Sequence, residues 1–128
     1  MTGNEYKNLA MRTNDGLGTP RLTEHLQAYC HGTVNYDIAE ILNGCLGLSG
    51  ETGEFNDMIK KWVFHEASLD LVHARKELGD ILWYVALVCN GFGWSLDEIM
   101  EMNIEKLKKR YPEGFSRELS AHRTQGDI

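Results

Sequence analysis

Apolar residues between Asn35 and about His65 recur every three to four positions, and no proline interrupts them. This spacing is typical of one long amphipathic helix, because residues three and four apart lie on the same face. Asn35 is a suitable N-cap for this helix, and the glycines within 47–50 mark the place where a bend is expected if the helix is not straight. A second run with the same period predicts another long helix from about Leu69 to Asn90.

Glycines, prolines and capping residues mark where the helices end. The segment "NGFG" at 90–93 suits a helix C-terminus, and "SLDE" at 95–98 has the Ser-x-x-Glu form of a capping box that opens a third helix. This helix is predicted to run to about Arg110, where "YPEG" stops it. Near the N-terminus we expect a short helix at about 4–12, followed by a loop, "TNDGLGTPR", at 13–21.

No segment shows convincing alternation of apolar and polar residues with a period of two, so no strand is predicted. The sequence therefore predicts an all-α helical bundle dominated by two long helices. With 128 residues, the chain is long enough for one domain with a core and too short for two. We expect a single domain over 1–128, with a short helix and loop at 1–21, the main helices at 35–111 and a C-terminal tail at 112–128.

Composition excludes several classes of protein. The formal net charge is -6, from 19 acidic residues against 13 Lys and Arg, which argues against binding to nucleic-acid polymers through their phosphates. The three cysteines form no CxxC pair, so neither a disulfide framework nor a zinc site is predicted. The N-terminal residues lack the features of a secretory signal, and the longest apolar run, "ILWYVALVC", is about half of the ~20 residues that a membrane-spanning helix needs. We therefore expect a cytoplasmic protein without a membrane segment.

Two pairs of acidic residues interrupt the apolar faces of the long helices. At 100° per residue, Glu51 and Glu54 fall within the apolar stripe of the first helix, and Glu77 and Asp80 fall within that of the second. Four ionised carboxylates close together would repel one another, so a cation is expected between them. Mg²⁺ fits this role, because it binds oxygen ligands and can share substrate phosphates. The spacing of three residues puts both acids of a pair within reach of one ion or a close pair of ions.

A single pair of acids three residues apart is common on a solvated helix face. Two such pairs on the apolar faces of two helices are much less readily explained in that way. Glycines at 44, 47, 50 and 53 leave room beside the first pair for a ligand or for close helix packing. Asp57 projects away from the stripe, so we expect it to be a surface residue.

The segments "GLSGETGE" at 47–54 and "KELGDILWY" at 76–84 resemble the ExxE and ExxD motifs of the MazG-like all-α nucleoside triphosphate pyrophosphohydrolases. The similarity extends through "NIEKLKKRYPEGFS" at 103–116 and, more weakly, to "EYKNLAMRT" at 5–13. The main departure is Thr52, where many relatives carry Ala; it lies off the acidic face.

This resemblance implies Mg²⁺-dependent hydrolysis of a (d)NTP between its α- and β-phosphates, with Mn²⁺ able to substitute and a house-cleaning role in the nucleotide pool. It also implies a homodimer or tetramer in which the two long helices of each subunit complete a central bundle. The apolar run at 81–89 agrees with this, since one small subunit does not readily cover all its sides. We expect the metal ligands and catalytic residues to be four acids: Glu51, Glu54, Glu77 and Asp80. The spacing does not identify which of them serves as the general base.

The third helix carries candidates for nucleotide binding. The resemblance implies that Asn103 and Lys106 contact the nucleotide; Arg110 shares their face and Tyr111 follows it. The alternative for this stripe is an ordinary solvated helix end, where the macrodipole favours cations.

Two candidates lie on the long helices themselves. Lys61 is nearer the acidic face than Lys60 and is a candidate for a phosphate contact, and Tyr84 is the better candidate for stacking on the base. Trp62 is expected mainly in core packing, whereas His73, like His65, is expected on the surface or in packing rather than as a ligand.

Two other classes of function remain open. A non-enzymatic helical regulator could bind a nucleotide or a partner protein on the same scaffold, and the metal could serve only as a structural staple. The complete set of four acids argues for the enzyme. The sequence does not identify the preferred base or sugar, because discrimination depends on pocket contacts outside the motifs.

Overall fold

The structure, a computed structural model, describes residues 1–30 and 36–122. Within these two stretches it contains six α-helices, one short 3₁₀ helix and no β-strand, which confirms the predicted all-α class. Contacts along the chain divide it into two compact units, Met1–Ile38 and Ala39–Ile128.

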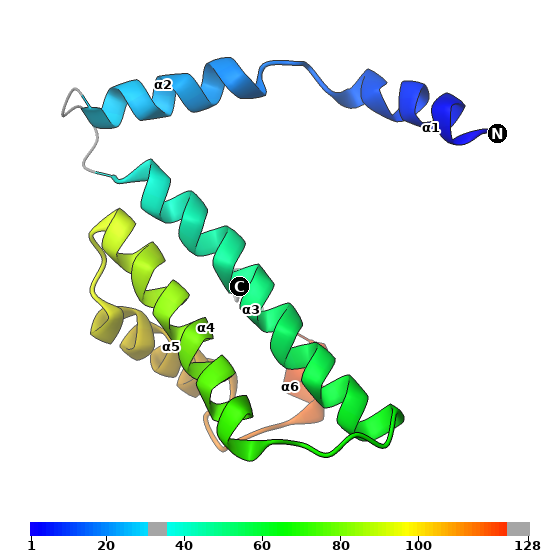
Figure 1. Ribbon diagram of the computed structural model, residues 1–128. Helices are drawn as coiled ribbons and strands as arrows, with labels where there is room; N and C mark the ends of the chain where they lie inside the picture. The colour runs from blue at the N-terminus through cyan, green and yellow to red at the C-terminus, as the bar shows by residue number, and fades with distance from the viewer. Residues whose placement is uncertain (31–35, 123–128) are drawn as a thin grey trace. The chain divides into compact units, whose positions relative to one another are not determined.

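The first unit is built from short helices (Figure 1). In chain order they are α1 (Gly3–Ala10), the 3₁₀ helix η1 (Met11–Thr13) and α2 (Gly18–Cys30). A capping box opens α1, in which the Thr2 hydroxyl accepts from the Glu5 N–H at 3.1 Å and the Glu5 carboxylate accepts from the Thr2 N–H. The helix predicted at 4–12 is therefore confirmed, with η1 as its last turn.

The loop predicted at 13–21 is wrong in its second half, because α2 already begins at Gly18. Pro20 lies in the first turn of α2, where the missing N–H of proline removes no intrahelical hydrogen bond. The shorter connection is held by Asp15, which accepts from the Leu17 N–H at 3.0 Å and pairs with both terminal nitrogens of Arg21 at 3.1 and 2.6 Å.

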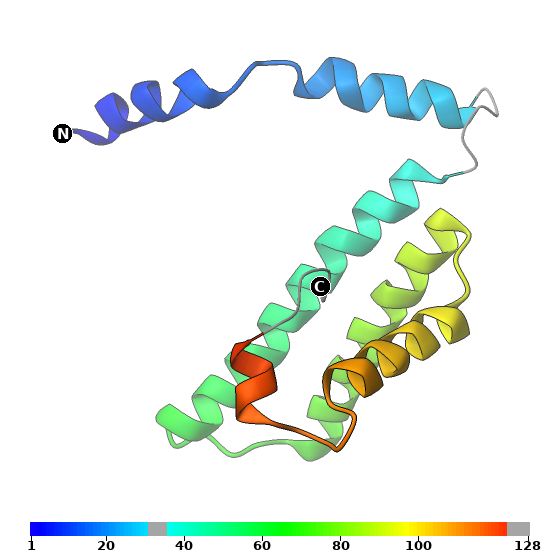
Figure 2. The same cartoon turned by 180° about the vertical axis from the view of Figure 1, so that it is seen from behind.

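The second unit contains the two long helices that carry the acidic residues. Its elements are α3 (Ile38–Phe64), α4 (Leu71–Phe92), α5 (Leu96–Arg110) and α6 (Arg117–Ala121). Figures 1 and 2 show α3 and α4 side by side and antiparallel. At one end of this pair the Asn90 side-chain amide donates to Glu40 Oε2 at 2.7 Å.

Glycines on α3 allow the two long helices to approach closely. A Cβ atom at Gly47 would lie 2.1 Å from Tyr84 Cε1, and one at Gly44 would lie 2.5 Å from Val88 Cγ2. Both distances are far inside ordinary carbon contact at about 3.5–4.0 Å. The glycines therefore set the separation of the backbones that position the acids.

Most helix ends agree with the sequence. Asp70 caps α4, and Gly93, with φ of 71°, ends it in the left-handed conformation that glycine favours. The Ser95 hydroxyl accepts from the Glu98 N–H at 3.3 Å at the start of α5. The first long helix begins at Ile38, somewhat later than predicted, and runs unbroken through 47–50. Its predicted cap, Asn35, lies outside the described residues.

The predicted C-terminal tail is partly helical. Within 112–128, Ser116 caps α6 by accepting from the Leu119 N–H at 3.3 Å. The tail prediction therefore missed one short helix in the part that the structure describes.

Many large apolar side chains of the second unit are exposed in the single chain. On α4, Leu82 is 65% exposed and Trp83 is 57% exposed. Trp62 on α3 is 49% exposed, so its predicted place in the core is wrong for one copy of the chain. No helix in the described stretches is both long and apolar enough to cross a membrane.

Candidate metal centre

The four acids singled out in the sequence come from α3 and α4. Glu51 on α3 and Glu77 and Asp80 on α4 each offer a carboxylate oxygen, and these three atoms all lie within 4.8 Å of one another. Glu54, one turn after Glu51, lines a cleft together with Glu77. The structure thus brings Glu51 of the first pair close to both acids of the second pair, while Glu54 lines the cleft with Glu77.

The electrostatics of this group favour a cation. Partial loss of water raises the pKa of Glu51 above its usual value, and the negative charges of Glu54, Asp80 and Glu77 raise it further. Glu77 is only 8% exposed, and its Oε2 has no hydrogen-bond partner among the described residues. A buried carboxylate oxygen without a partner is unfavourable, so it calls for a positive ligand.

The donor set fits a hard divalent ion. Mg²⁺ and Mn²⁺ prefer oxygen ligands, and three carboxylates at these separations supply them. The unpartnered Glu77 Oε2 is the atom whose environment such an ion would complete.

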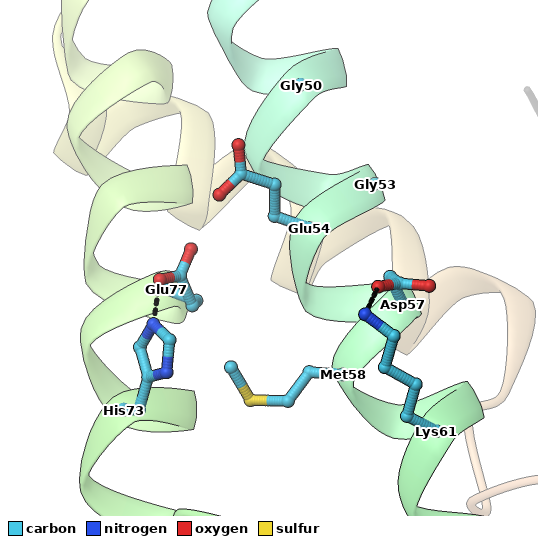
Figure 3. Close-up of a pocket in the computed structure, with 8 residues that line it drawn as sticks. All are labelled: Gly50, Gly53, Glu54, Asp57, Met58, Lys61, His73 and Glu77. Carbon is cyan, nitrogen blue, oxygen red and sulfur yellow. Dashed lines mark ion pairs between the residues drawn. The ribbon is translucent and has the colours of Figure 1, made fainter. Parts of the chain in front are cut away.

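A cleft of about 500 Å³ adjoins the acids (Figure 3). That volume lies within the range of sites for small ligands. Figure 3 shows Glu54 extending from α3 toward α4, the helix that carries His73 and Glu77. The residues that line the cleft are Gly50, Gly53, Glu54, Asp57, Met58, Lys61, His73 and Glu77.

Lys61, the candidate for a phosphate contact, lines the cleft and forms an ion pair with Asp57. Its Nζ lies 2.6 Å from Asp57 Oδ2, and the Lys60 Nζ lies 2.9 Å from Asp57 Oδ1. Lys61 first, and then Lys60, lower the pKa of Asp57 to about 2. Asp57 is partly exposed, as predicted, yet it also forms part of the cleft wall.

His73 also lines the cleft, although the sequence predicts it on the surface or in packing. Its Nε2 lies 2.7 Å from Glu77 Oε1, one helical turn along α4. The spacing of four residues from Glu77 was the signal that could have found it, because such residues meet on one helical face.

Tyr84, the candidate for base stacking, is used in packing α3 against α4. Its ring lies over Gly47 and meets the Trp83 ring edge-on, with centroids 5.0 Å apart. Tyr84 is not among the described residues that line the cleft. Stacking of Tyr84 on a base stays a prediction.

The nucleotide-binding candidates on α5 or just after it are also not among the described residues that line the cleft. Asn103 and Lys106 are exposed, and the Arg110 guanidinium lies 6.0 Å from the centroid of the Tyr111 ring. The Tyr111 ring in turn packs against Phe115 with centroids 5.5 Å apart. None of these four residues is among the described residues that line the cleft, and their role stays a prediction.

Comparisons with known proteins agree with the geometry. The family model described as the MazG nucleotide pyrophosphohydrolase domain matches residues 41–115, which hold all four acids. The chain is 35% identical over 75 residues to the Gene 37 protein of Mycobacterium phage L5; the match covers 54% of this chain and 64% of that protein. No solved structure matches the chain. With more than half of its length matched by this model, the chain belongs to the MazG nucleotide pyrophosphohydrolase family.

Proposed function

We propose that the protein is a Mg²⁺-dependent nucleoside triphosphate pyrophosphohydrolase. One water molecule would be added across the anhydride between the α- and β-phosphates of a (d)NTP, giving a (d)NMP and pyrophosphate. The observation that carries this proposal is the convergence of the Glu51, Glu77 and Asp80 carboxylates within 4.8 Å, with Glu77 Oε2 unpartnered, in a member of this family.

The positions of the four acids suggest separate roles in metal binding and in proton transfer. Glu51, Glu77 and Asp80 would hold Mg²⁺, or Mn²⁺ in its place, with Glu54 completing the set. When bound, the metal neutralises phosphate charge and lowers the pKa of water. Glu54 lines the cleft, is exposed and stands outside the closest group of three, so it is our candidate for the general base that accepts a proton from the attacking water.

We propose that Lys61 binds the triphosphate. Lys61 and its partner Asp57 are both cleft-lining residues, so an entering phosphate oxygen would compete with the Asp57 carboxylate for Lys61 Nζ. Phosphate carries more negative charge than one carboxylate, which favours transfer of the lysine to the substrate.

We also propose that the nucleotide contacts Tyr84 of α4 and four residues on α5 or just after it: Asn103, Lys106, Arg110 and Tyr111. For α5, the helix that contacts the nucleotide would come from the same chain or from a second copy. A homodimer or tetramer is supported by the exposed apolar residues of α4, Leu82 and Trp83. The house-cleaning role and the cytoplasmic location stay predictions.

A substrate panel tests the proposal. Ordinary and modified nucleotides would be incubated with Mg²⁺ and protein, and pyrophosphate and phosphate would be measured separately. We expect pyrophosphate release by the wild-type protein, little by Glu54→Gln and Asp80→Asn, and an unchanged rate in Glu24→Gln, which alters an exposed acid of α2.

Two outcomes would favour the other classes of function. Tight nucleotide binding with no turnover after long incubation with Mg²⁺ would indicate a regulator. A large loss of stability on chelation, without hydrolysis of any nucleotide, would indicate a metal that only staples the helices.

A further inference from the structure

The Glu77 side chain is held in an asymmetric environment. On one side, Oε1 lies 2.7 Å from His73 Nε2, a distance suited to N–H donation (Figure 3). On the other side, Oε2 is buried and has no hydrogen-bond partner among the described residues. The two oxygens of one carboxylate are therefore distinguished by the imidazole.

The backbone that carries His73 is itself anchored. Asp70, the N-cap of α4, accepts from the N–H groups of Val72 and His73, both at 3.0 Å. These bonds satisfy two of the donors that a helix N-terminus leaves without intrahelical partners. His73 thus lies in a capped first turn, and its ring projects along the helix to Glu77, four residues on.

His73 is not part of the group that could ligate the metal. The atoms that lie within 4.8 Å of one another, among the described residues, come from Glu51, Glu77 and Asp80. The imidazole contacts one member of that group from outside, in the arrangement by which residues around a metal site orient its ligands.

We propose that His73 is a positioning residue, which engages Oε1 of Glu77 and so presents Oε2 to a divalent cation shared with Glu51 and Asp80. This inference rests on the metal site of the proposed function. It assigns to His73 a role in metal affinity that does not involve contact with the ion or with the nucleotide.

Metal binding in the absence of nucleotide tests the inference. Mn²⁺ would be titrated into the full-length protein, with free Mn²⁺ measured by electron paramagnetic resonance. In His73→Ala we expect the Kd for Mn²⁺ to rise by roughly 10- to 100-fold, the usual effect of losing such an outer partner. In His73→Gln we expect affinity close to wild type, because the amide nitrogen of Gln can occupy the place of Nε2.

Two controls make the result specific. His65→Ala removes an exposed histidine that is not among the cleft-lining residues, and it should leave the Kd unchanged. Circular dichroism should show wild-type helix content in His73→Ala, since Ala is a stronger helix former than His.

Wild-type affinity in His73→Ala would overturn the inference, and so would a loss in His73→Gln as large as that in His73→Ala. Failure of the proposed function is distinguishable from these outcomes. A wild-type protein that binds no Mn²⁺ overturns both ideas, whereas one that binds Mn²⁺ in a His73-dependent way but releases no pyrophosphate overturns only the proposed function.

Discussion

Gly47 allows α3 to approach α4 so closely that the Tyr84 ring fills the space where any other residue would carry a Cβ atom. In Gly47→Ala the added carbon would lie 2.1 Å from Tyr84 Cε1 and 2.4 Å from both Cδ1 and Cζ. Ordinary carbon contacts begin at about 3.5 Å, so the ring or the helix must shift by more than about 1 Å. The substitution therefore tests the helix contact that brings Glu51 to Glu77 and Asp80.

The expected magnitude is the balance of two effects. Overpacking costs about 1–3 kcal/mol, and the upper end applies here because three ring atoms are involved and Trp83 packs edge-on against the same ring. Ala improves helix propensity over Gly by about 1 kcal/mol. The free energy of unfolding should therefore fall by about 2 kcal/mol, which lowers the Tm by roughly 8 °C for a chain of this size.

Urea unfolding of metal-free protein, followed by circular dichroism, measures this change. The matched control is Gly79→Ala on α4, where an added Cβ meets nothing within 4 Å and the variant should gain up to about 1 kcal/mol. The double variant Gly47→Ala/Tyr84→Ala should lose less stability than the two single changes added together. If Gly47→Ala were as stable as Gly79→Ala, the close approach of α3 and α4 would be refuted.

Other expectations follow from the charges. Because the pKa of Glu51 is raised, its ionised form destabilises the metal-free fold fully above the raised pKa; this penalty decreases as the pH falls below that value and is gone below the unfolded pKa. Glu51→Gln should therefore raise the Tm of metal-free protein at pH 7 while abolishing the further rise with Mg²⁺; an unchanged Mg²⁺ response would contradict this. Asp57→Asn should lower the KM for the triphosphate by releasing Lys61, and Lys61→Met should raise it, as measured by steady-state kinetics. The lowered pKa of Asp70 means that its stabilisation is present above its unfolded pKa and is lost as the pH falls through the folded value. Asp70→Ala should thus lower the urea midpoint more at pH 7 than at pH 3, and equal effects at both would count against the cap. Chelation with EDTA should stop pyrophosphate release and lower the Tm, with both restored by Mg²⁺.

Local signals explain how much of the fold could be predicted. The long helices, the Ser95 cap and the Gly93 stop depend on residues close together in the sequence, and the structure has them near the predicted places. The glycines and Pro20 of 13–21 predict a loop, but proline also suits a first helical turn, and α2 begins within this segment at Gly18. Trp62 was placed in the core because the helical wheel shows which face is apolar, without showing whether one chain covers it.

Part of the candidate site could also be predicted from the sequence, and part of it could not. The convergence of Glu51, Glu77 and Asp80 agrees with the helical periodicity, which places each acidic pair on the apolar face of its helix. The contact of His73 with Glu77 depends on side-chain rotamers, which spacing alone does not determine. Lys61 was predicted to lie near the acidic face as a candidate for a phosphate contact, but its ion pair with Asp57 depends on the conformations of both side chains. The position of α5 depends on tertiary packing, so Asn103 and Lys106 could be carried over only from the family resemblance.

The central claim is cleavage between the α- and β-phosphates by the carboxylates of α3 and α4. Phosphorus NMR of a hydrolysed nucleotide, selected from the substrate panel, tests it most directly, because monophosphate, diphosphate, phosphate and pyrophosphate give separate signals. With Mg²⁺ and wild-type protein, we expect monophosphate and pyrophosphate in equal amounts, and neither product with a folded Glu77→Gln protein. Formation of diphosphate and phosphate, or equal rates in the wild-type and Glu77→Gln proteins, would contradict the account.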